Sequence, residues 1–134
     1  MNKTEARDFI SKGFKSLTAS SKSYQEKVHL DFIKDLLEKK NFSHVASYMS
    51  LPYEVSTEKI NKFLIDSKTH LYLPKINLES NKLEFVLCNK ETQFKKNSLN
   101  ILEPISEEII RLEELNAVIV PLRAFNENFQ RLGF

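Results

Sequence analysis

The sequence predicts an α/β fold in which an open, mostly parallel sheet is flanked by helices. Segments with the apolar period of a helix alternate with short apolar segments of strand character. The run Ala117–Pro121 is nearly continuous and β-branched, which is typical of a central parallel strand buried on both faces. Such sheets bind ligands beyond the carboxyl ends of their strands, so we expect the functional site there.

Two helices are predicted at the N-terminus. Apolar residues recur at helical spacing over residues 3–17, and a break at 18–21 precedes a second helix that ends near Lys40. Ser20 or Ser21 would cap the second helix. The side chains that the second helix is expected to bury are Tyr24, Val28, Phe32, Ile33, Leu36 and Leu37.

The sheet is predicted within residues 44–134. The expected strands are 45–51, which ends in a turn at Pro52, 70–73, which Pro74 stops, 83–87, which follows a turn at 77–81, and 117–121. Ser56 or Thr57 would cap a helix that buries Ile60, Phe63 and Leu64.

The remaining segments give weaker signals. The polar residues 91–100 predict a loop or a single helical turn, and Ser106 would cap a short helix reaching Leu115. Since no repeat or low-complexity linker interrupts the sequence, residues 1–134 are predicted to form a single α/β domain.

Composition excludes several classes of protein. The 41% hydrophobic and 28% charged residues suit a soluble globular protein, and no apolar run approaches the roughly 20 residues of a membrane span. Cys88 is the only cysteine, which predicts no internal disulfide and fits a cytoplasmic location. The net charge of +2 is too small to indicate nucleic acid.

Catalytic groups of the common kinds are not evident. His29, His44 and His70 show no metal-ligand spacing to each other or to Cys88, and no Ser-His-Asp or Cys-His arrangement stands out. We therefore expect no protein-bound metal and no protein nucleophile. In an enzyme of this kind, the activated group would belong to the substrate or to a nucleotide.

Two cations near the N-terminus form one candidate site. Lys3 and Arg7 are four residues apart and share a helix face, so together they could hold a polyphosphate. The other interpretation is a basic surface pair near a fraying terminus, and spacing alone does not choose between the two.

The segment after the first strand forms a second candidate site. Glu54 could accept hydrogen bonds from the N–H groups of a heterocycle, and Met49 could pack against a flat aromatic ligand. The alternatives are an ordinary loop glutamate and a methionine that fills the core.

The end of the sequence forms a third candidate site. Arg131 precedes Gly133, and a strand running into a loop that turns on glycine can present backbone N–H groups to a phosphate. An ordinary surface arginine is the alternative.

Taken together, these segments resemble the 5-formyltetrahydrofolate cyclo-ligases, also called methenyltetrahydrofolate synthetases, over essentially the whole chain. The matching segments are Lys3-x-x-x-Arg7, Leu17-Thr18-Ala19, the strand and loop of 46–57 with Glu54, Tyr72-Leu73-Pro74-Lys75, Ile101-Leu102-Glu103-Pro104, Ile119-Val120-Pro121, Ala124-Phe125 and Arg131-Leu132-Gly133. Each segment is weak alone, but their common order and spacing make the resemblance specific.

The resemblance implies a three-layer, Rossmann-like sheet of the CoA-transferase type and an ATP-dependent ring closure in a monomer. The formyl oxygen of 5-formyltetrahydrofolate would attack the γ-phosphate of ATP, N10 would then attack the activated carbon, and 5,10-methenyltetrahydrofolate, ADP and phosphate would result. Mg²⁺ is expected with the nucleotide.

The resemblance also implies roles for individual residues. Lys3 and Arg131 would be catalytic, and Met49 and Glu54 would bind the folate. The residues implied to bind ATP are Lys3, Thr4, Glu5, Ala6, Arg7, Arg131, Leu132, Gly133 and Phe134.

The sequence departs from the family pattern at two places. Leu122 and Asn126 stand where the family usually has the glycine and the aspartate of Pro-Gly-x-Ala-Phe-Asp. The family then continues beyond Arg-Leu-Gly into a glycine-rich segment with a metal-ligand aspartate, and this chain has two glycines in all. We therefore expect a C-terminal truncation; a non-catalytic folate- or nucleotide-binding remnant is the alternative function.

Overall fold

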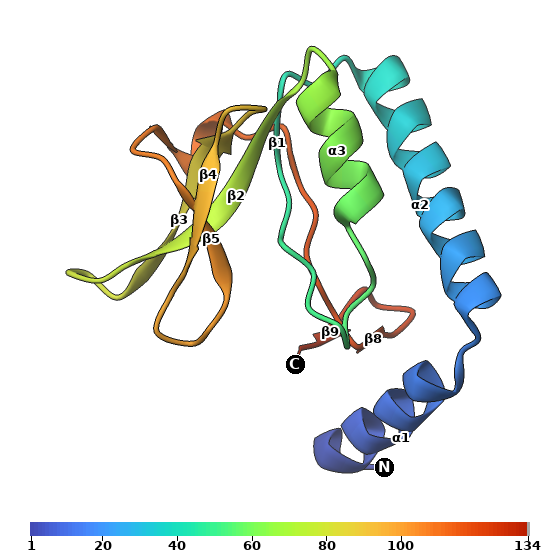
Figure 1. Ribbon diagram of the computed structural model, residues 1–134. Helices are drawn as coiled ribbons and strands as arrows, with labels where there is room; N and C mark the ends of the chain where they lie inside the picture. The colour runs from blue at the N-terminus through green and yellow to red at the C-terminus, as the bar shows by residue number, and fades with distance from the viewer. Residues whose placement is uncertain (134) are drawn as a thin grey trace.

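The computed structural model describes residues 1–133 and places three helices beside a five-stranded sheet and two small hairpins (Figure 1). None of the described helices is long and apolar enough to cross a membrane. In chain order the elements are α1 (Lys3–Ser16), α2 (Ala19–Lys40), β1 (His44–Ala46), α3 (Glu58–Asp66), β2 (His70–Asn77), β3 (Lys82–Cys88), β4 (Gln93–Lys96), β5 (Leu102–Ile105), β6 (Ile109–Ile110), the 3₁₀ helix η1 (Leu112–Glu114), β7 (Ala117–Val118), β8 (Ala124–Phe125) and β9 (Arg131–Leu132).

The sheet is mixed, with strand order β6-β3-β2-β1-β7. β1 pairs in parallel with β2 and β7, whereas β3 is antiparallel to both β2 and β6. Since β6 opposes β3 and β3 opposes β2, four of the five strands run in one direction. The predicted α/β class with a mostly parallel sheet and flanking helices is confirmed.

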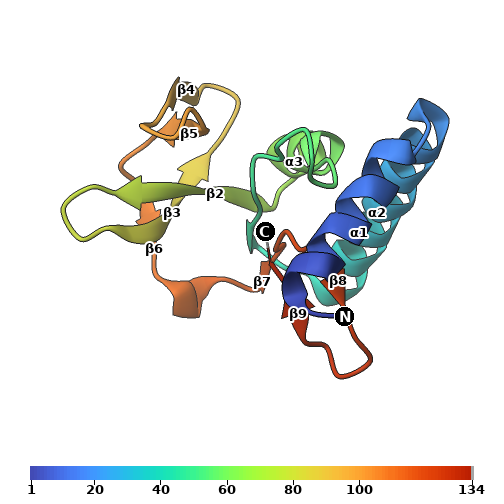
Figure 2. The same cartoon turned by 90° about the horizontal axis from the view of Figure 1, so that it is seen from below.

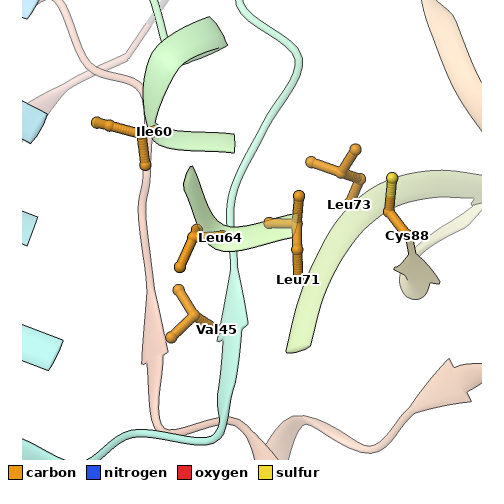
Figure 3. Close-up of a cluster of buried hydrophobic side chains, with 6 residues drawn as sticks. All are labelled: Val45, Ile60, Leu64, Leu71, Leu73 and Cys88. Carbon is orange, nitrogen blue, oxygen red and sulfur yellow. The ribbon is translucent and has the colours of Figure 1, made fainter. Parts of the chain in front are cut away.

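Helices α2 and α3 pack on one face of the sheet, around the cluster shown in Figure 3. Leu64 of α3 and Leu71 of β2 are both completely buried at its centre. The opposite face carries a smaller cluster of Ala46, Tyr72 and Ile110. No α-helical residue within 1–133 belongs to that second cluster, so the described residues supply one of the two helical layers that a three-layer fold would have.

The predicted bounds of α1 and the predicted end of α2 near Lys40 agree with the structure to within a residue, but the predicted start and cap of α2 are wrong. α2 begins at Ala19, and Thr18 is its N-cap, with an extended backbone and a hydroxyl oxygen that accepts the Ser21 N–H at 3.1 Å. Ser20 and Ser21 therefore lie inside the first turn of the helix. The cap is the residue immediately before the first helical position, as the geometry of the unpaired N–H groups requires.

The predicted burial of α2 is also wrong for most of its apolar residues. Tyr24 and Phe32 are 69% and 65% exposed, and Val28 is 45% exposed. Only a narrow stripe that includes Ile33 and Leu37 packs against the core cluster. One side of the helix meets the sheet and α3, so apolar residues outside that stripe remain at the surface.

Strand β2 continues through Pro74, although Pro74 was predicted to stop it. The Ile76 N–H points away from β3 and donates to the Glu103 carboxylate at 2.8 Å. Pro74 lies two residues earlier and faces the same way, beyond Tyr72, where the pairing with β1 ends. The missing N–H of Pro74 thus ends the pairing with β1 and leaves the pairing with β3 intact.

Residues 91–100 and 106–115 also differ from the prediction. Instead of a loop, 91–100 contains β4, which pairs with β5 around a turn where the Asn97 side chain accepts the N–H groups of Leu99 and Ile101. Instead of a helix capped by Ser106, 106–115 forms β6 and η1, because Ile110 pairs with β3 and is buried there.

The predicted central strand at 117–121 is a short strand beside β1. β7 covers only two residues, and it pairs on one side, with β1, among residues 1–133. Val118 and Val120 are 45% and 44% exposed. The apolar run therefore indicates a strand correctly, but its burial on both faces is wrong for the described part of the chain.

We predict that Glu103 fixes the β4–β5 hairpin to the edge of β2. The carboxylate is 7% exposed and accepts the Ile76 N–H, so Glu103→Ala would leave that donor without its partner. The free energy of unfolding in urea should fall by about 2 kcal/mol, and Glu103→Gln should cost less because its amide oxygen still accepts. Glu107→Ala, at a 92% exposed side chain, is the control. Equal stability of the Glu103→Ala and wild-type proteins would contradict this role.

Candidate functional site

The C-terminal hairpin of β8 and β9 lies beside α1 (Figures 1 and 2). Arg7 Nε donates to the carbonyl oxygen of Gly133 at 3.1 Å. Arg123 Nη1 donates to the carbonyl oxygen of Arg7 at 3.3 Å and also to Ser11 Oγ. The structure therefore brings together the N-terminal and C-terminal segments that were predicted to bind the same phosphate group.

Helix α1 begins with a complete capping box. Asn2 Oδ1 accepts the Glu5 N–H at 2.8 Å, and the Glu5 carboxylate accepts the Asn2 N–H at 3.1 Å. Glu5 thus stabilises the start of the helix. Lys3 and Thr4 are exposed in the first turn, whereas Ala6 and Arg7 are half-buried. The positive end of the helix dipole and two cations therefore face the same region of the surface.

The C-terminal segment folds as a hairpin of β8 and β9. The backbone N–H of Arg123 donates to the Leu132 carbonyl at 2.8 Å. Gly133 does not have a positive φ, and its carbonyl oxygen accepts the hydrogen bond from Arg7. Arg131 is exposed and donates to the Pro121 carbonyl at 3.3 Å. The predicted site residue Phe134 lies outside the described residues.

The two departures from the family pattern are accommodated locally. Asn126 Oδ1 accepts the N–H groups of Asn128 and Gln130, both at 3.0 Å, so it closes the turn of the hairpin as an aspartate could. Leu122 does not have a positive φ, and its backbone therefore does not require glycine.

Glu54 lies in the loop between β1 and α3 and lines a cavity of about 260 Å³. Its Oε1 accepts the Leu51 N–H at 2.9 Å. Burial raises the pKa of the Glu54 carboxyl above its ordinary value, although the Leu51 hydrogen bond opposes the shift. Burial, and to a smaller degree the charge of Glu54, raise the pKa of Tyr48 to about 12, and its hydroxyl donates to the Val55 carbonyl.

A second cavity of about 460 Å³ shares Phe14, Lys22, Pro52 and Val55 with the first. Lys15, Lys22 and Arg123 are its cationic residues, and it has no acidic lining residue. The lining is otherwise mainly apolar or aromatic, with Ile10 and Phe14 from α1 and Tyr53 and Leu122 from two loops.

The sequence alone did not indicate that Phe14, Lys22 and Arg123 line one cavity. Phe14 was assigned to the apolar face of a helix, and Lys22 and Arg123 were not singled out. The helical period places Phe14 seven residues after Arg7, on the same face of α1, which could have indicated its position. No local signal connects Arg123 with α1.

Met49 lies in a different cavity from Glu54. It packs against the core cluster and lines a cavity of about 760 Å³ with Leu73, Cys88 and Phe94. The structure thus does not bring the two predicted folate-binding side chains together in one cavity.

The loop between Met49 and Glu54 is anchored by α3. The Thr57 hydroxyl donates to the Tyr48 carbonyl at 2.6 Å, and Asn61 Nδ2 donates to the same oxygen at 2.9 Å. Thr57 occupies the predicted N-cap position, but its side chain makes this long-range bond and no capping bond.

The histidines and acidic residues do not form a metal centre in the part of the chain that is described. No group of three or more His, Cys, Asp or Glu side chains there is placed to hold a metal ion. The rings of His44 and His70 lie 5.4 Å apart, tilted by 51°, at the amino ends of β1 and β2, away from Glu54 and the loop that follows β1.

Comparison with known proteins identifies the family. The sequence profile of the 5-formyltetrahydrofolate cyclo-ligase family matches residues 1–134. The chain belongs to this family. Its sequence is 28% identical over 121 residues to the 5-formyltetrahydrofolate cyclo-ligase of Haemophilus influenzae, an alignment that covers 88% of this chain. The resemblance inferred from the sequence is therefore confirmed.

Solved structures support the cyclo-ligase fold. The NMR structure of Aquifex aeolicus 5,10-methenyltetrahydrofolate synthetase superposes with a TM-score of 0.85 at 25% identity and covers the whole chain. The Mycoplasma pneumoniae 5,10-methenyltetrahydrofolate synthetase superposes with a TM-score of 0.70 at 21% identity, again over the whole chain, and supports the fold alone. The chain spans 65% of the H. influenzae protein, 68% of the Aquifex chain and 72% of the Mycoplasma chain.

We predict that Glu54 makes the stability of this cyclo-ligase chain dependent on pH. The folded state holds the Glu54 proton more tightly than the unfolded state, because burial raises the pKa. The stability that this preference contributes is present below the ordinary value of 4.5 and is lost as the pH rises through the folded-state pKa. Glu54→Gln does not titrate, so its stability relative to wild type should improve as the pH is raised.

Urea unfolding of both proteins from about pH 4 to about pH 7 measures this difference. Glu79→Gln, at an exposed turn position, is the matched control. A difference between Glu54→Gln and wild type that stays constant over this range would show that Glu54 does not couple to folding.

Proposed function

We propose that this chain binds ATP and 5-formyltetrahydrofolate and supports the ATP-dependent formation of 5,10-methenyltetrahydrofolate. The observation that carries the proposal is the contact between Arg7 and Gly133. It joins the two segments that resemble the ATP-binding parts of the family, from opposite ends of the sequence. The family membership supplies the reaction class.

The phosphate end of the proposed site lies at the start of α1. The bond from Arg7 Nε to Gly133 fixes the guanidinium plane, and its terminal nitrogens make no hydrogen bond with residues 1–133 that would compete with a phosphate oxygen. Lys3 lies one turn earlier and is exposed, and Arg131 is exposed on β9. Three cations and a helix N-terminus suit a polyphosphate.

Magnesium would enter this site with the nucleotide. Since residues 1–133 form no cluster that could hold a metal ion by itself, the described residues do not provide a preformed Mg²⁺ site. Mg²⁺ commonly retains water and binds through substrate phosphates with few protein ligands.

The folate end of the proposed site lies in the cavity lined by Glu54. A carboxylate at this position can accept hydrogen bonds from the N–H groups of the reduced heterocycle. The adjoining 460 Å³ cavity leads from there along α1, with the aromatic side chains of Phe14 and Tyr53 in its lining. Met49 lines the separate cavity of about 760 Å³, so it would contact the folate only across the loop that joins Met49 to Glu54.

The reaction needs charge neutralisation and positioning more than it needs a protein nucleophile. The formyl oxygen forms a bond to the γ-phosphorus of ATP as ADP leaves. N10 then forms a bond to the formyl carbon as its own proton is released to solvent and phosphate leaves, which closes the ring. Lys3 and Arg131 are proposed to stabilise the negative charge that moves between the phosphate oxygens. A monomer would suffice, because this chain supplies both ends of the site.

Two substitutions separate the two ends of the site. Arg7→Ala should weaken ATP binding about tenfold or more, because a charge-assisted hydrogen bond contributes roughly 1.5–3 kcal/mol, and should leave 5-formyltetrahydrofolate binding nearly unchanged. Glu54→Gln should show the reverse pattern. Isothermal titration with Mg-ATP and with 5-formyltetrahydrofolate measures both affinities.

Arg111→Ala is the control, since Arg111 is exposed and pairs only locally, with Glu114 at 3.3 Å. Failure of the wild-type chain to bind ATP would overturn the nucleotide part of the proposal. Binding of ATP without any binding of the folate would favour a nucleotide-binding role without the ring closure.

A further inference from the structure

We propose that Arg123 is a positioning residue that holds α1 in the orientation needed for phosphate binding. The inference rests on the proposed function, because it concerns the same ATP site. Arg123 occupies the variable position of the family's Pro-Gly-x-Ala-Phe-Asp segment, between Leu122 and Ala124. Neither the resemblance nor the sequence pattern gives it a role.

Helix α1 depends on polar contacts for its position. None of its residues is buried, and Phe9 on its surface is 68% exposed. Apolar packing therefore fixes α1 much less firmly than it fixes α3, whose Leu64 is completely buried. The hydrogen bonds between α1 and the C-terminal segment come from the side chains of Arg7 and Arg123, and Lys22 of α2 lies over the Phe14 ring at 4.7 Å from its centroid.

The two arginines bind across the same interface in opposite directions. Arg7 extends from α1 to the Gly133 carbonyl, whereas Arg123 extends from the C-terminal segment to the Arg7 carbonyl and the Ser11 hydroxyl of α1. One contact would let the helix pivot, but two contacts at neighbouring points restrict both its rotation and its translation. Arg123 thus fixes the backbone of the residue whose side chain is proposed to bind phosphate.

Arg123 is itself held in place by the hairpin. Its backbone N–H donates to the Leu132 carbonyl at 2.8 Å, directly beside Gly133, and its side chain is half-buried against the 460 Å³ cavity. The chain of contacts from Leu132 through Arg123 to Arg7 and back to Gly133 is therefore closed. A change at Arg123 should move α1 relative to the hairpin without disturbing the core.

The test compares Arg123→Leu with Arg123→Lys in the full chain. Arg123→Leu should weaken Mg-ATP binding about tenfold, because it removes both charge-assisted bonds to α1. 5-Formyltetrahydrofolate affinity and the urea midpoint should change much less. Arg123→Lys should recover part of the ATP affinity, since a lysine can still donate to the Arg7 carbonyl. Arg111→Leu, an exposed arginine away from α1, is the control.

Hydrogen exchange gives a readout that does not require ATP. In Arg123→Leu, the amides of residues 6–14 should exchange several-fold faster than in wild type, while those of α3 stay unchanged. Unchanged exchange in α1, or ATP affinity equal to wild type, would overturn the positioning role. Loss of protection across the whole sheet would show that Arg123 stabilises the fold, which also overturns it. If wild-type protein binds no ATP but exchange in α1 responds, the proposed function fails and the anchoring of α1 stands.

Discussion

A charged hydrogen bond between Arg7 and Gly133 joins residues that are 126 positions apart in the sequence. Helix α1 has no buried residue, so its position depends on contacts of this kind. The bond therefore also determines where α1 lies. It places the cationic start of a helix next to the end of the described chain and so creates the surface on which the proposed phosphate site depends.

The sheet provides the fixed frame for this arrangement. β1 lies between β2 and β7 and is parallel to both, so the loop that carries Glu54 and the segment that leads to Arg123 leave the sheet at the same edge. α3 then fixes the Glu54 loop through Thr57 and Asn61, which both bind the Tyr48 carbonyl. The Glu54 loop, which is held by α3, thus faces a helix that is held by side-chain contacts, and the proposed folate and nucleotide ends of the site lie on these two parts.

Local sequence patterns predicted the helices and turns that depend on apolar periodicity and on hydrogen bonds between nearby residues. The helical period gave both ends of α1 and the C-terminal end of α2 to within a residue, and the turn at 77–81 is closed by Asn77, whose side chain accepts the N–H groups of Glu79 and Ser80. The predictions were wrong where contacts between distant segments determine the secondary structure. Pro74 is tolerated because its partner strand ends there, and residues 93–96 form a strand because β5 pairs with them.

The candidate site, too, was predicted only in part. Arg7 and Glu54 were identified from their types and from the family resemblance, and the structure gives each a defined setting. Arg123 could not be found in this way, because its partners on α1 are more than one hundred residues away. The separation of Met49 from Glu54 was equally invisible, since the path of the loop that joins them is set by tertiary contacts with α3.

Hydrogen exchange of the wild-type chain with and without Mg-ATP shows whether the two ends of the chain form one phosphate-binding surface. If they do, residues 3–14 and 123–133 gain protection together, at the same nucleotide concentration, while α2 changes little. Protection confined to one of the two segments, or an equal change throughout the molecule, would contradict a single surface.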